Sequence, residues 1–278
     1  MPALAQPASS LITRPIPSTG EPLPAVGLGT AAVFDSADNT ALQNARAVVR
    51  ALIDDGGKLI DTASTYGDAE RILGDVIGPT GWRGKLFIAT KLEAADVEEL
   101  KRSLNRLQTA KLDLLQLHNV RNPQQSLGAF RDWKAQGVCR YIGITSTSHG
   151  TLAALEAILQ REKPDFVQID YSIDDREAEQ RILPVAAEVK AGVLTALPFG
   201  RGRLFRAVRG RSLPDWAQGF AGSWAQFFLK YLLGDPRVTA VIPGTANAGH
   251  MADNLAAMRG LLPDPDQRRQ MTQFIETL

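Results

Sequence analysis

Short apolar runs alternate with amphipathic helical segments eight times along this chain of 278 residues, and this alternation restricts its fold more than any other feature. A short apolar run between turn residues is typical of a buried strand, whereas apolar residues three and four apart indicate a helix. The predicted strands are 25–28, 58–62, 86–91, 113–118, 141–145, 166–171, 192–198 and 238–243. The predicted helices are 44–55, 69–77, 96–107, 127–136, 151–161, 177–189, 223–234 and 250–258.

Repeated strand–helix units favour a parallel sheet that closes on itself, the (β/α)8 or TIM barrel. A doubly wound open sheet is the main alternative. It requires a G-x-G-x-x-G loop after an early strand, and Gly27-Leu28-Gly29-Thr30 does not continue in that way. No Ser-, Pro- or Gly-rich linker divides the chain, so residues 1–278 are predicted to form a single domain, with residues 1–15 irregular or flexible.

The composition excludes several function classes. The formal net charge is +1 and most arginines are scattered, so a nucleic acid is not an expected partner. Cys139 is the only cysteine, which excludes an internal disulfide and a cysteine-based metal cage; we expect it to be a buried apolar residue. No apolar run reaches the roughly 18 residues of a membrane span, so no membrane partner is expected.

The start of the chain leaves two localisations open. It lacks the basic start and the apolar stretch of a secretory signal, which predicts a cytoplasmic protein. Ala3-Leu4-Ala5 followed by Gln6 has the small-x-small form of a signal-peptidase site, so a periplasmic protein that has lost its leader is the alternative. The sequence does not determine the oligomeric state, and a monomer is favoured over an oligomer.

Ionisable residues stand at the carboxyl ends of three successive predicted strands. Asp61, Lys91 and His118 each end an otherwise apolar run, and Tyr66 follows Asp61 after a short loop. Taken singly, such an Asp usually caps a turn, such a Lys is solvated, and such a His is a satisfied core residue. Active sites of barrels lie at the carboxyl ends of the strands, and titratable groups that converge there indicate catalysis. The sequence therefore predicts one catalytic cluster.

These residue types suit the reduction of a carbonyl by hydride transfer, which builds negative charge on the carbonyl oxygen and requires a proton there. An isolated phenol, with a pKa of about 10, is a poor acid, but a neighbouring ammonium stabilises the phenolate. We therefore expect Tyr66 to be the general acid and Lys91 its cationic neighbour. Asp61 would orient Lys91, and His118 would donate a hydrogen bond to the carbonyl oxygen. This chemistry needs no metal, and none is predicted.

Further motifs, in order along the chain from Ile16 to Ala257, resemble those of the aldo-keto reductases. They are Gly27-Leu28-Gly29-Thr30, Asp61-Thr62-Ala63-x-x-Tyr66-Gly67, Ala89-Thr90-Lys91, Asp113-Leu114-Leu115-Gln116-Leu117-His118, Tyr141-Ile142-Gly143-Ile144-Thr145-Ser146, Pro198-Phe199-Gly200-Arg201-Gly202 and Ile242-Pro243-Gly244-Thr245. The resemblance implies a TIM barrel that binds extended NADP(H) at its carboxyl-end mouth, with NAD(H) as the alternative cofactor, and the same four catalytic residues.

The resemblance also implies a set of cofactor-binding residues. They are Thr30 and Asp61 near the nicotinamide; Thr145, Ser146 and Gln168 on its carboxamide; Pro198, Phe199, Gly200, Arg201, Gly202 and Leu204 around the pyrophosphate; and Gly244, Thr245, His250, Asp253 and Asn254 at the adenosine end.

Two departures from the family pattern concern the nicotinamide. Ala196 stands where many members stack an aromatic ring, and Thr145-Ser146 replaces the more usual Ser-Asn pair. Asn119 follows the predicted catalytic histidine where a Trp that contacts substrate is common. We expect Asn119, Phe34 and Trp82 to line the substrate pocket, although Trp82 also suits helix packing. The tail after residue 261 is short, which predicts an open site and a reductase of low selectivity.

A third departure concerns the choice of cofactor. Gly244 and His250 replace a Lys and an Arg that hold the 2′-phosphate in many members, which weakens the preference for NADPH. Arg201 and Arg203, on the long connection 200–222, are the candidates to replace those cations. NADP(H) is still the expected cofactor.

The sequence therefore predicts an NADPH-dependent reductase of aldehydes or ketones, with a small-molecule carbonyl compound as its only expected partner. The alternative is a nicotinamide-binding redox sensor with little turnover, although such a protein has no need of all four catalytic residues. A metal-assisted barrel hydrolase is disfavoured, because the chain lacks the histidine and carboxylate clusters that such a site requires.

Overall fold

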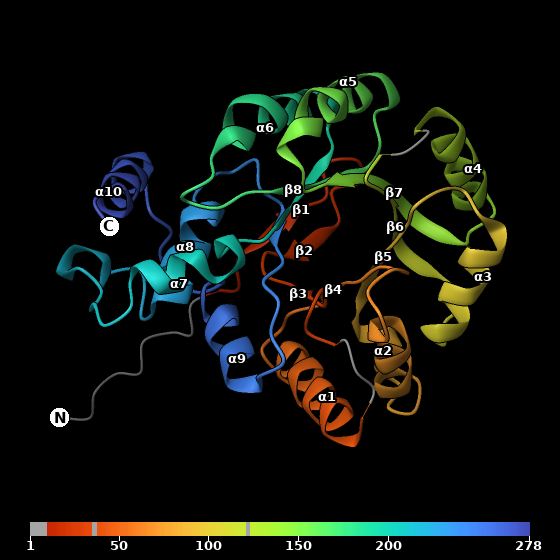
Figure 1. The fold of residues 1–278 in the computed structure, drawn as a ribbon, viewed down its shortest axis with the longest axis horizontal. Coiled ribbons are helices and arrows are strands. Elements are labelled where there is room, and N and C mark those ends of the chain that lie inside the picture. Colours follow the sequence, from red (N-terminus) through yellow and green to blue (C-terminus); the bar gives the residue numbers. More distant parts are fainter. Residues whose placement is uncertain (1–9, 35–37, 121–122) are drawn as a thin grey trace.

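Eight parallel strands follow one another around a barrel in the computed structural model, which describes residues 10–34, 38–120 and 123–278 (Figure 1). The strands pair in the order β3 to β10, and bridges between Val26 and Val241 and between Gly29 and Gly244 join the two edges of the sheet. The predicted (β/α)8 barrel is thereby confirmed. The strands are β3 (Leu28–Gly29), β4 (Leu59–Asp61), β5 (Phe87–Leu92), β6 (Leu112–His118), β7 (Cys139–Ser146), β8 (Phe166–Asp170), β9 (Gly192–Ala196) and β10 (Ala240–Val241).

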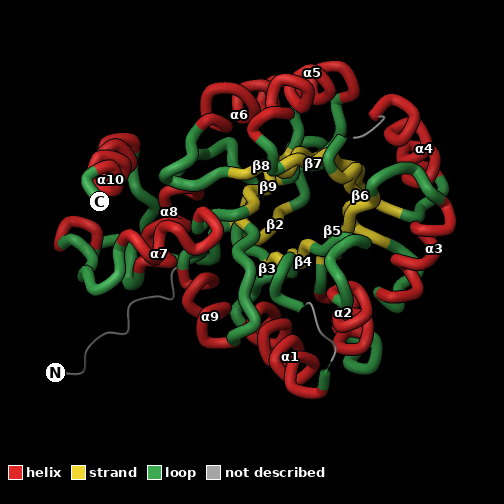
Figure 2. Tube along the Cα trace, viewed as in Figure 1, coloured by secondary structure: helices red, strands yellow, loops and turns green. Residues whose placement is uncertain are grey.

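Helices surround this ring of strands, as Figure 2 shows. Those in the predicted repeats are α1 (Asn39–Asp54), α2 (Ala69–Ile77), α3 (Val97–Arg106), α4 (Pro123–Ala135), α5 (Leu152–Glu162), α6 (Glu177–Val189), α8 (Trp224–Leu233) and α9 (Ala248–Ala256). Two more helices, α7 (Arg203–Ala207) and α10 (Pro265–Glu276), were not predicted. No helix of the described residues is long and apolar enough to cross a membrane. The Ala3-Leu4-Ala5 motif lies outside the described residues.

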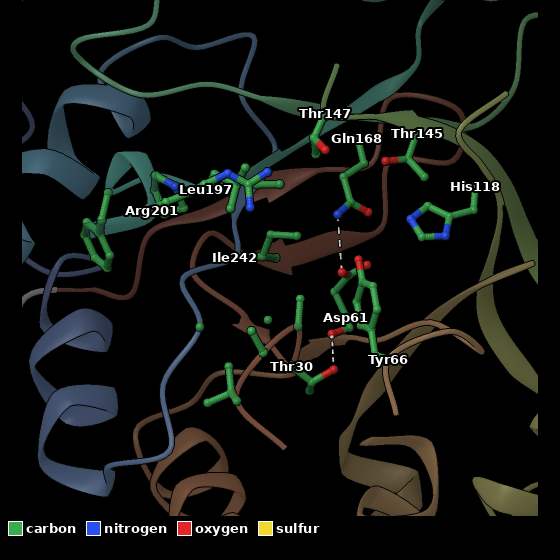
Figure 3. Close-up of a pocket in the computed structure, with 18 of the residues that line it drawn as sticks. Thr30, Asp61, Tyr66, His118, Thr145, Thr147, Gln168, Leu197, Arg201 and Ile242 are labelled. Carbon is green, nitrogen blue, oxygen red and sulfur yellow. Dashed lines mark hydrogen bonds between the residues drawn. The ribbon is translucent and has the colours of Figure 1, made fainter. Parts of the chain in front are cut away.

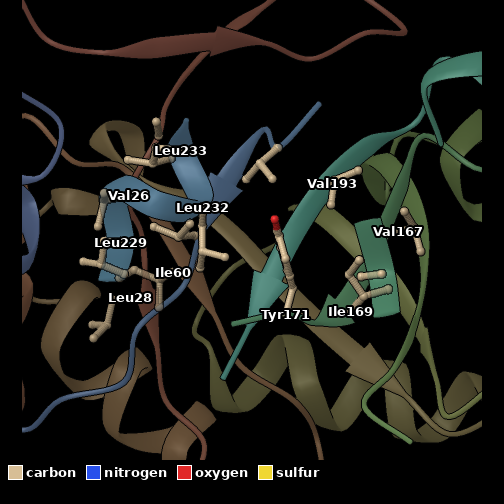
Figure 4. Packing of buried hydrophobic residues seen from close by; sticks show 14 of the residues in the cluster. Val26, Leu28, Ile60, Val167, Ile169, Tyr171, Val193, Leu229, Leu232 and Leu233 are labelled. Carbon is tan, nitrogen blue, oxygen red and sulfur yellow. The ribbon is translucent and has the colours of Figure 1, made fainter. Parts of the chain in front are cut away.

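Successive residues of each strand point alternately into the barrel and out toward the helices. On β4, Ile60 belongs to the outer core, where strand residues meet Leu229, Leu232 and Leu233 of α8 (Figure 4). Leu59 points into the barrel, where apolar side chains from the strands form an interior core. Asp61, two residues later, also points into the barrel. The single cysteine, Cys139, is buried in the outer core as predicted.

A hairpin closes the amino end of the barrel. It consists of β1 (Thr13–Pro15) and β2 (Pro22–Pro24), paired antiparallel, where the sequence predicted irregular chain up to residue 15. Ile16 and Leu23 from this hairpin join the interior core, which also contains Phe87 and other inward-facing apolar residues. The barrel interior is therefore apolar and filled at the amino end, which leaves the carboxyl end for the site.

The C-terminal helix α10 packs against the outside of the barrel, where the sequence suggested only a short tail. Asp264 caps it in a reciprocal capping box with Gln267. Arg268 of α10 donates to the Tyr171 hydroxyl at 2.9 Å and to Glu179 Oε1 at 2.9 Å. These contacts join α10 to the residue that follows β8 and to α6.

Gly29 gives a test of barrel closure, because a Cβ atom there would lie 2.8 Å from the carbonyl oxygen of Ile242. We expect Gly29→Ala to lower the free energy of unfolding by about 1–3 kcal/mol, as overpacking does. Gly128→Ala is the control: this glycine lies inside α4 with open space around it, so alanine should stabilise by about 0.5–1 kcal/mol. Urea unfolding measures both, and an unchanged stability in Gly29→Ala would contradict the tight closure.

Candidate active site

A cavity of about 630 Å³ opens at the carboxyl end of the barrel (Figure 3). Three of the four residues predicted to be catalytic, Asp61, Tyr66 and His118, line it. The fourth, Lys91, lies beneath the cavity with its side chain only 1% exposed. The structure therefore brings all four predicted residues together.

Asp61 and Lys91 form a buried ion pair below the cavity floor. Lys91 Nζ donates to Asp61 Oδ2 at 2.6 Å and to the carbonyl oxygen of Thr62 at 2.7 Å. Asp61 also accepts from Gln116 Nε2 at 3.1 Å and from Gln168 Nε2 at 3.3 Å. A buried charge is tolerated only where it is paired and hydrogen-bonded, and both partners meet that condition here.

Tyr66 reaches the cavity from the loop that follows β4. Its backbone N–H donates to the carbonyl of Ala63 at 3.1 Å, so the chain turns back over the end of the strand. Lys91 Nζ lies 4.8 Å from the centre of the phenol ring. The Tyr66 and His118 rings meet edge to face, 5.9 Å apart. The phenol ring thus lies next to both the ammonium and the imidazole.

His118 ends β6 with its side chain 15% exposed. Burial, together with the nearby Lys91 ammonium, lowers the pKa of His118, and the carboxylates of Glu93 and Asp61 oppose this shift only in part. Glu93 Oε1 lies 2.8 Å from His118 Nδ1, close enough for an ion pair when the imidazole is protonated. The imidazole is therefore held neutral near pH 7.

The predicted cofactor residues fall into two groups. Those that line the cavity are Thr30, Asp61, Thr145, Gln168, Pro198, Phe199, Arg201, Gly202 and Gly244, and the predicted substrate residue Asn119 lines it too. Those that do not line it are Ser146, Gly200, Leu204, Thr245, His250, Asp253 and Asn254. Ser146 points outward from β7, where it bonds the Thr151 hydroxyl at 2.6 Å. Asp253 accepts from Ser223 and Gln226 of the α8 N-terminus.

Two predicted substrate residues lie away from the cavity. Phe34 is 1% exposed in the outer core. Trp82 begins a 3-10 turn (Trp82–Lys85) just before β5, so it lies at the amino end of that strand, opposite the cavity. Neither is proposed to contact substrate.

The loop after β9 has an unusual backbone. Leu197, Gly200, Arg201 and Gly202 all have positive φ, at 54°, 54°, 54° and 78°. Arg203, the next residue, donates to Asp174 Oδ2 at 2.6 Å. Arg201 is exposed and lines the cavity, and no described carboxylate pairs with it. The loop therefore presents a cation at the cavity mouth.

Several site residues were missed from the sequence. Gln116, fully buried, hydrogen-bonds Asp61 and shares its inward direction with His118 two residues later. Thr147 lines the cavity, two residues after Thr145. In both cases the signal was the period of two along a strand. In the described part of the chain, no group of three or more His, Cys, Asp or Glu side chains is placed to hold a metal ion.

The structure is a (β/α)8 barrel that brings Asp, Tyr, Lys and His together at the cavity at its carboxyl end. The sequence predicted this arrangement for an oxidoreductase that reduces carbonyl compounds. The chain matches the model of the Aldo/keto reductase family over residues 25–276. It therefore belongs to this family. The predicted family and enzyme class are confirmed.

Known relatives agree with this membership. Aldo-keto reductase YhdN of Bacillus subtilis (strain 168) is 30% identical over 205 residues, which span 66% of this chain and 60% of that protein. Methylglyoxal reductase YeaE of Escherichia coli (strain K12) is 28% identical over 248 residues, 85% of this chain and 86% of that protein. The crystal structure of an aldo-keto reductase from Klebsiella pneumoniae in complex with NADPH has a TM-score of 0.81 and 27% identity, covering 96% of this chain and 95% of that one.

The neutral state of His118 can be tested by titration. Since its pKa is lowered, the folded protein should keep His118 mostly neutral at a pH of about 6.5, where an ordinary imidazole is half charged. The unfolded chain binds this proton first as the pH falls, so the residue should lower stability from about pH 6.5 downward. NMR of the imidazole resonances measures the pKa directly.

Two variants should move this pKa in opposite directions. Lys91→Met removes a neighbouring positive charge and should raise the pKa of His118. Glu93→Gln removes a neighbouring negative charge and should lower it. Shifts of the same sign in both variants would contradict the electrostatic account.

Proposed function

We propose that this protein reduces aldehydes or ketones to alcohols by hydride transfer from NADPH, with Tyr66 as the general acid. The observation that carries the proposal is the position of the phenol, which lines the cavity with the His118 ring 5.9 Å away and with Lys91 Nζ 4.8 Å from its centre. When bound, reduced nicotinamide would supply the hydride. The chain itself has to supply the proton and stabilise the charge on the carbonyl oxygen.

The residues of the cavity fit a nicotinamide dinucleotide. Gln168 Oε1 is buried and has no hydrogen-bond partner in the described part of the chain, although its amide nitrogen is held by Asp61. A carboxamide N–H would satisfy that acceptor. Thr145 lines the cavity nearby, and Arg201 offers a cation for a phosphate at the mouth. A structural neighbour from Klebsiella pneumoniae, crystallised with NADPH, supports the same cofactor.

The buried pair would assist proton donation by Tyr66 through the charge of Lys91. As the phenol donates its proton, negative charge forms on its oxygen, and the buried Lys91 ammonium, whose Nζ lies 4.8 Å from the ring centre, would stabilise that charge. Asp61 holds Lys91 in place through the 2.6 Å bond. Because the pKa of His118 is lowered, its imidazole is neutral and can donate one N–H to the carbonyl oxygen without competing for the proton.

We propose small aldehydes and ketones as substrates. Ala196, Leu197 and Ile242 give the cavity an apolar wall, and Asn119 adds a polar group next to His118. The relative YeaE is named a methylglyoxal reductase, so this dicarbonyl belongs in any substrate panel.

Tyr66→Phe tests the identity of the acid. Loss of the proton donor should lower the rate of aldehyde reduction by roughly 10²–10⁴-fold, the usual contribution of general acid catalysis, with NADPH binding near that of the wild type. Tyr141→Phe is the matched control: this hydroxyl bonds Glu21 at 2.7 Å at the other end of the barrel, so its loss should leave the rate unchanged. A stopped-flow assay of NADPH oxidation measures both.

Two outcomes of that assay would contradict the proposal. A wild-type rate in Tyr66→Phe would exclude Tyr66 as the acid. If the wild-type protein bound NADPH but oxidised it with no member of a broad aldehyde and ketone panel, the redox-sensor alternative would be favoured.

Cofactor choice is tested at Arg201. We expect NADPH to bind more tightly than NADH. Arg201→Ala should weaken the binding of NADPH by roughly 10–100-fold, which corresponds to the loss of about 1.5–3 kcal/mol from a charge-assisted hydrogen bond, and should have little effect on the binding of NADH. Arg203→Ala is the control, because Arg203 is already paired with Asp174. Fluorescence titration gives the dissociation constants, and equal values for the two cofactors in the wild-type protein would refute the preference.

A further inference from the structure

A second cavity, of about 590 Å³, lies at the opposite end of the barrel from the catalytic cavity. It is enclosed by the residues before β4 and β5, by the starts of β6 and β7, and by the hairpin that closes the barrel. The lining residues are Glu21, Pro22, Leu23, Ile53, Gly56, Gly57, Lys58, Arg83, Gly84, Lys85, Leu86, Phe87, Asp113 and Arg140. We call it the basal cavity.

The basal cavity is separate from the catalytic one. The interior core, with Leu59, Phe87, Leu114 and Phe166 among its members, fills the barrel between the two. Among the residues that the structure describes, none lines both cavities. A molecule in the basal cavity would therefore not reach Tyr66 or the cofactor residues.

Acidic groups in the basal cavity are already satisfied by its arginines. Asp113 accepts from Arg83 at 2.9 Å, from Arg140 at 3.0 Å and from the backbone N–H of Ile88 at 2.9 Å. Glu21 forms an ion pair with Arg140 and accepts from the Tyr141 hydroxyl at 2.7 Å. These contacts hold the two guanidinium groups in fixed positions at the cavity wall.

Two lysines remain. Lys58 directly precedes β4, and Lys85 ends the turn before β5; both are exposed, and neither pairs with a carboxylate of the described residues. The cavity thus has four cationic and two acidic side chains, an excess of two positive charges. Apolar side chains, among them Ile53 and Phe87, lie beside them. Concave sites that combine an apolar wall with a few converging polar groups are typical of small-molecule binding.

We propose that the basal cavity binds a compact organic dianion, such as a phosphate monoester or a dicarboxylate. Lys58 and Lys85 would supply the charge that attracts and holds it, and the paired arginines would present their remaining N–H groups. The apolar wall would contact its carbon skeleton. This site is additional to the catalytic cavity and does not depend on the proposed reaction.

Isothermal titration calorimetry of this 278-residue chain tests the proposal, with phenyl phosphate, a phosphate monoester, and succinate, a dicarboxylate, as separate probes. Each titration is run with and without saturating NADPH. A probe that binds in the cavity at the carboxyl end competes with NADPH, so that binding disappears when NADPH is present. We expect at least one probe to bind in the presence of NADPH and to weaken as salt is raised. Comparing the two probes distinguishes a phosphate from a carboxylate ligand.

Charge-reversal variants locate the binding. The double variant Lys58→Glu/Lys85→Glu should lower the affinity for the probe by about tenfold or more and leave the rate of aldehyde reduction unchanged. Lys163→Glu/Lys190→Glu is the matched control: these exposed lysines precede β8 and β9 at the same end of the barrel but do not line the cavity, and the change in net charge is the same. If the first double variant does not fold, Lys58→Gln/Lys85→Gln removes the charges without reversing them.

Three results would overturn the proposal. The first is that neither probe, at millimolar concentration, binds in the presence of NADPH. The second is that the wild type and the Lys58 and Lys85 variants bind the probe with equal affinity. The third is that the Lys163 and Lys190 control loses as much affinity for the probe as the Lys58 and Lys85 variant does.

Discussion

The buried contact between Asp61 and Lys91 is the interaction on which the site depends. Removing an ion from water costs several kcal/mol, and a buried pair recovers this only when its remaining hydrogen-bonding groups are also satisfied. Here the carbonyl of Thr62 and the amides of Gln116 and Gln168 complete the pair. Loss of either charge would leave the other uncompensated. The residues from four strands are therefore interdependent, and the geometry of the cavity floor is a property of all of them together.

Because side chains alternate along each strand, the inward-facing positions form a row, and on β4 and β5 this row is apolar toward the amino end of the barrel and polar toward the carboxyl end. On β4, Leu59 lies in the interior core and Asp61 lies in the polar half. On β5, Phe87 and Ala89 are in the same core and Lys91 follows in the same direction. Because both halves are built from the same strands, the filled core supports the ion pair from below and isolates it from the amino end of the barrel.

This alternation also marks what the sequence allows to be predicted. The parallel strands and the proximity of Asp61, Lys91 and His118 followed from apolar runs that end in ionisable residues. Thr145 and Ser146 were predicted as a pair on the carboxamide, but neighbouring strand residues face opposite sides, so Thr145 lines the cavity and Ser146 does not. Trp82 was placed at the cavity although it precedes its strand, which puts it at the other end of the barrel.

Elements outside the repeats were harder to predict. Helix α10 has few apolar residues, of which Met271 and Ile275 are buried, so its periodicity is weak. Its start was nevertheless visible in Asp264-Pro265, a capping residue followed by proline at the first helical position. The local sequence does not reveal the hydrogen-bond partners of Arg268, because Tyr171 and Glu179 lie about a third of the chain away.

The loop after β9 shows how backbone strain and function meet at the cavity mouth. Gly200 and Gly202 adopt positive φ at little cost. Arg201, which lies between these glycines, and Leu197, three residues before the first of them, also have positive φ, at 54° each. A left-handed conformation costs a residue with a side chain roughly 1–2 kcal/mol. Both of these residues line the catalytic cavity, whereas Arg203, in helical conformation, is tied to Asp174. Strained conformations persist where the surrounding structure enforces them, and they concentrate at functional sites. The strain at Arg201 therefore supports a binding role for its side chain that the salt-bridged Arg203 does not share.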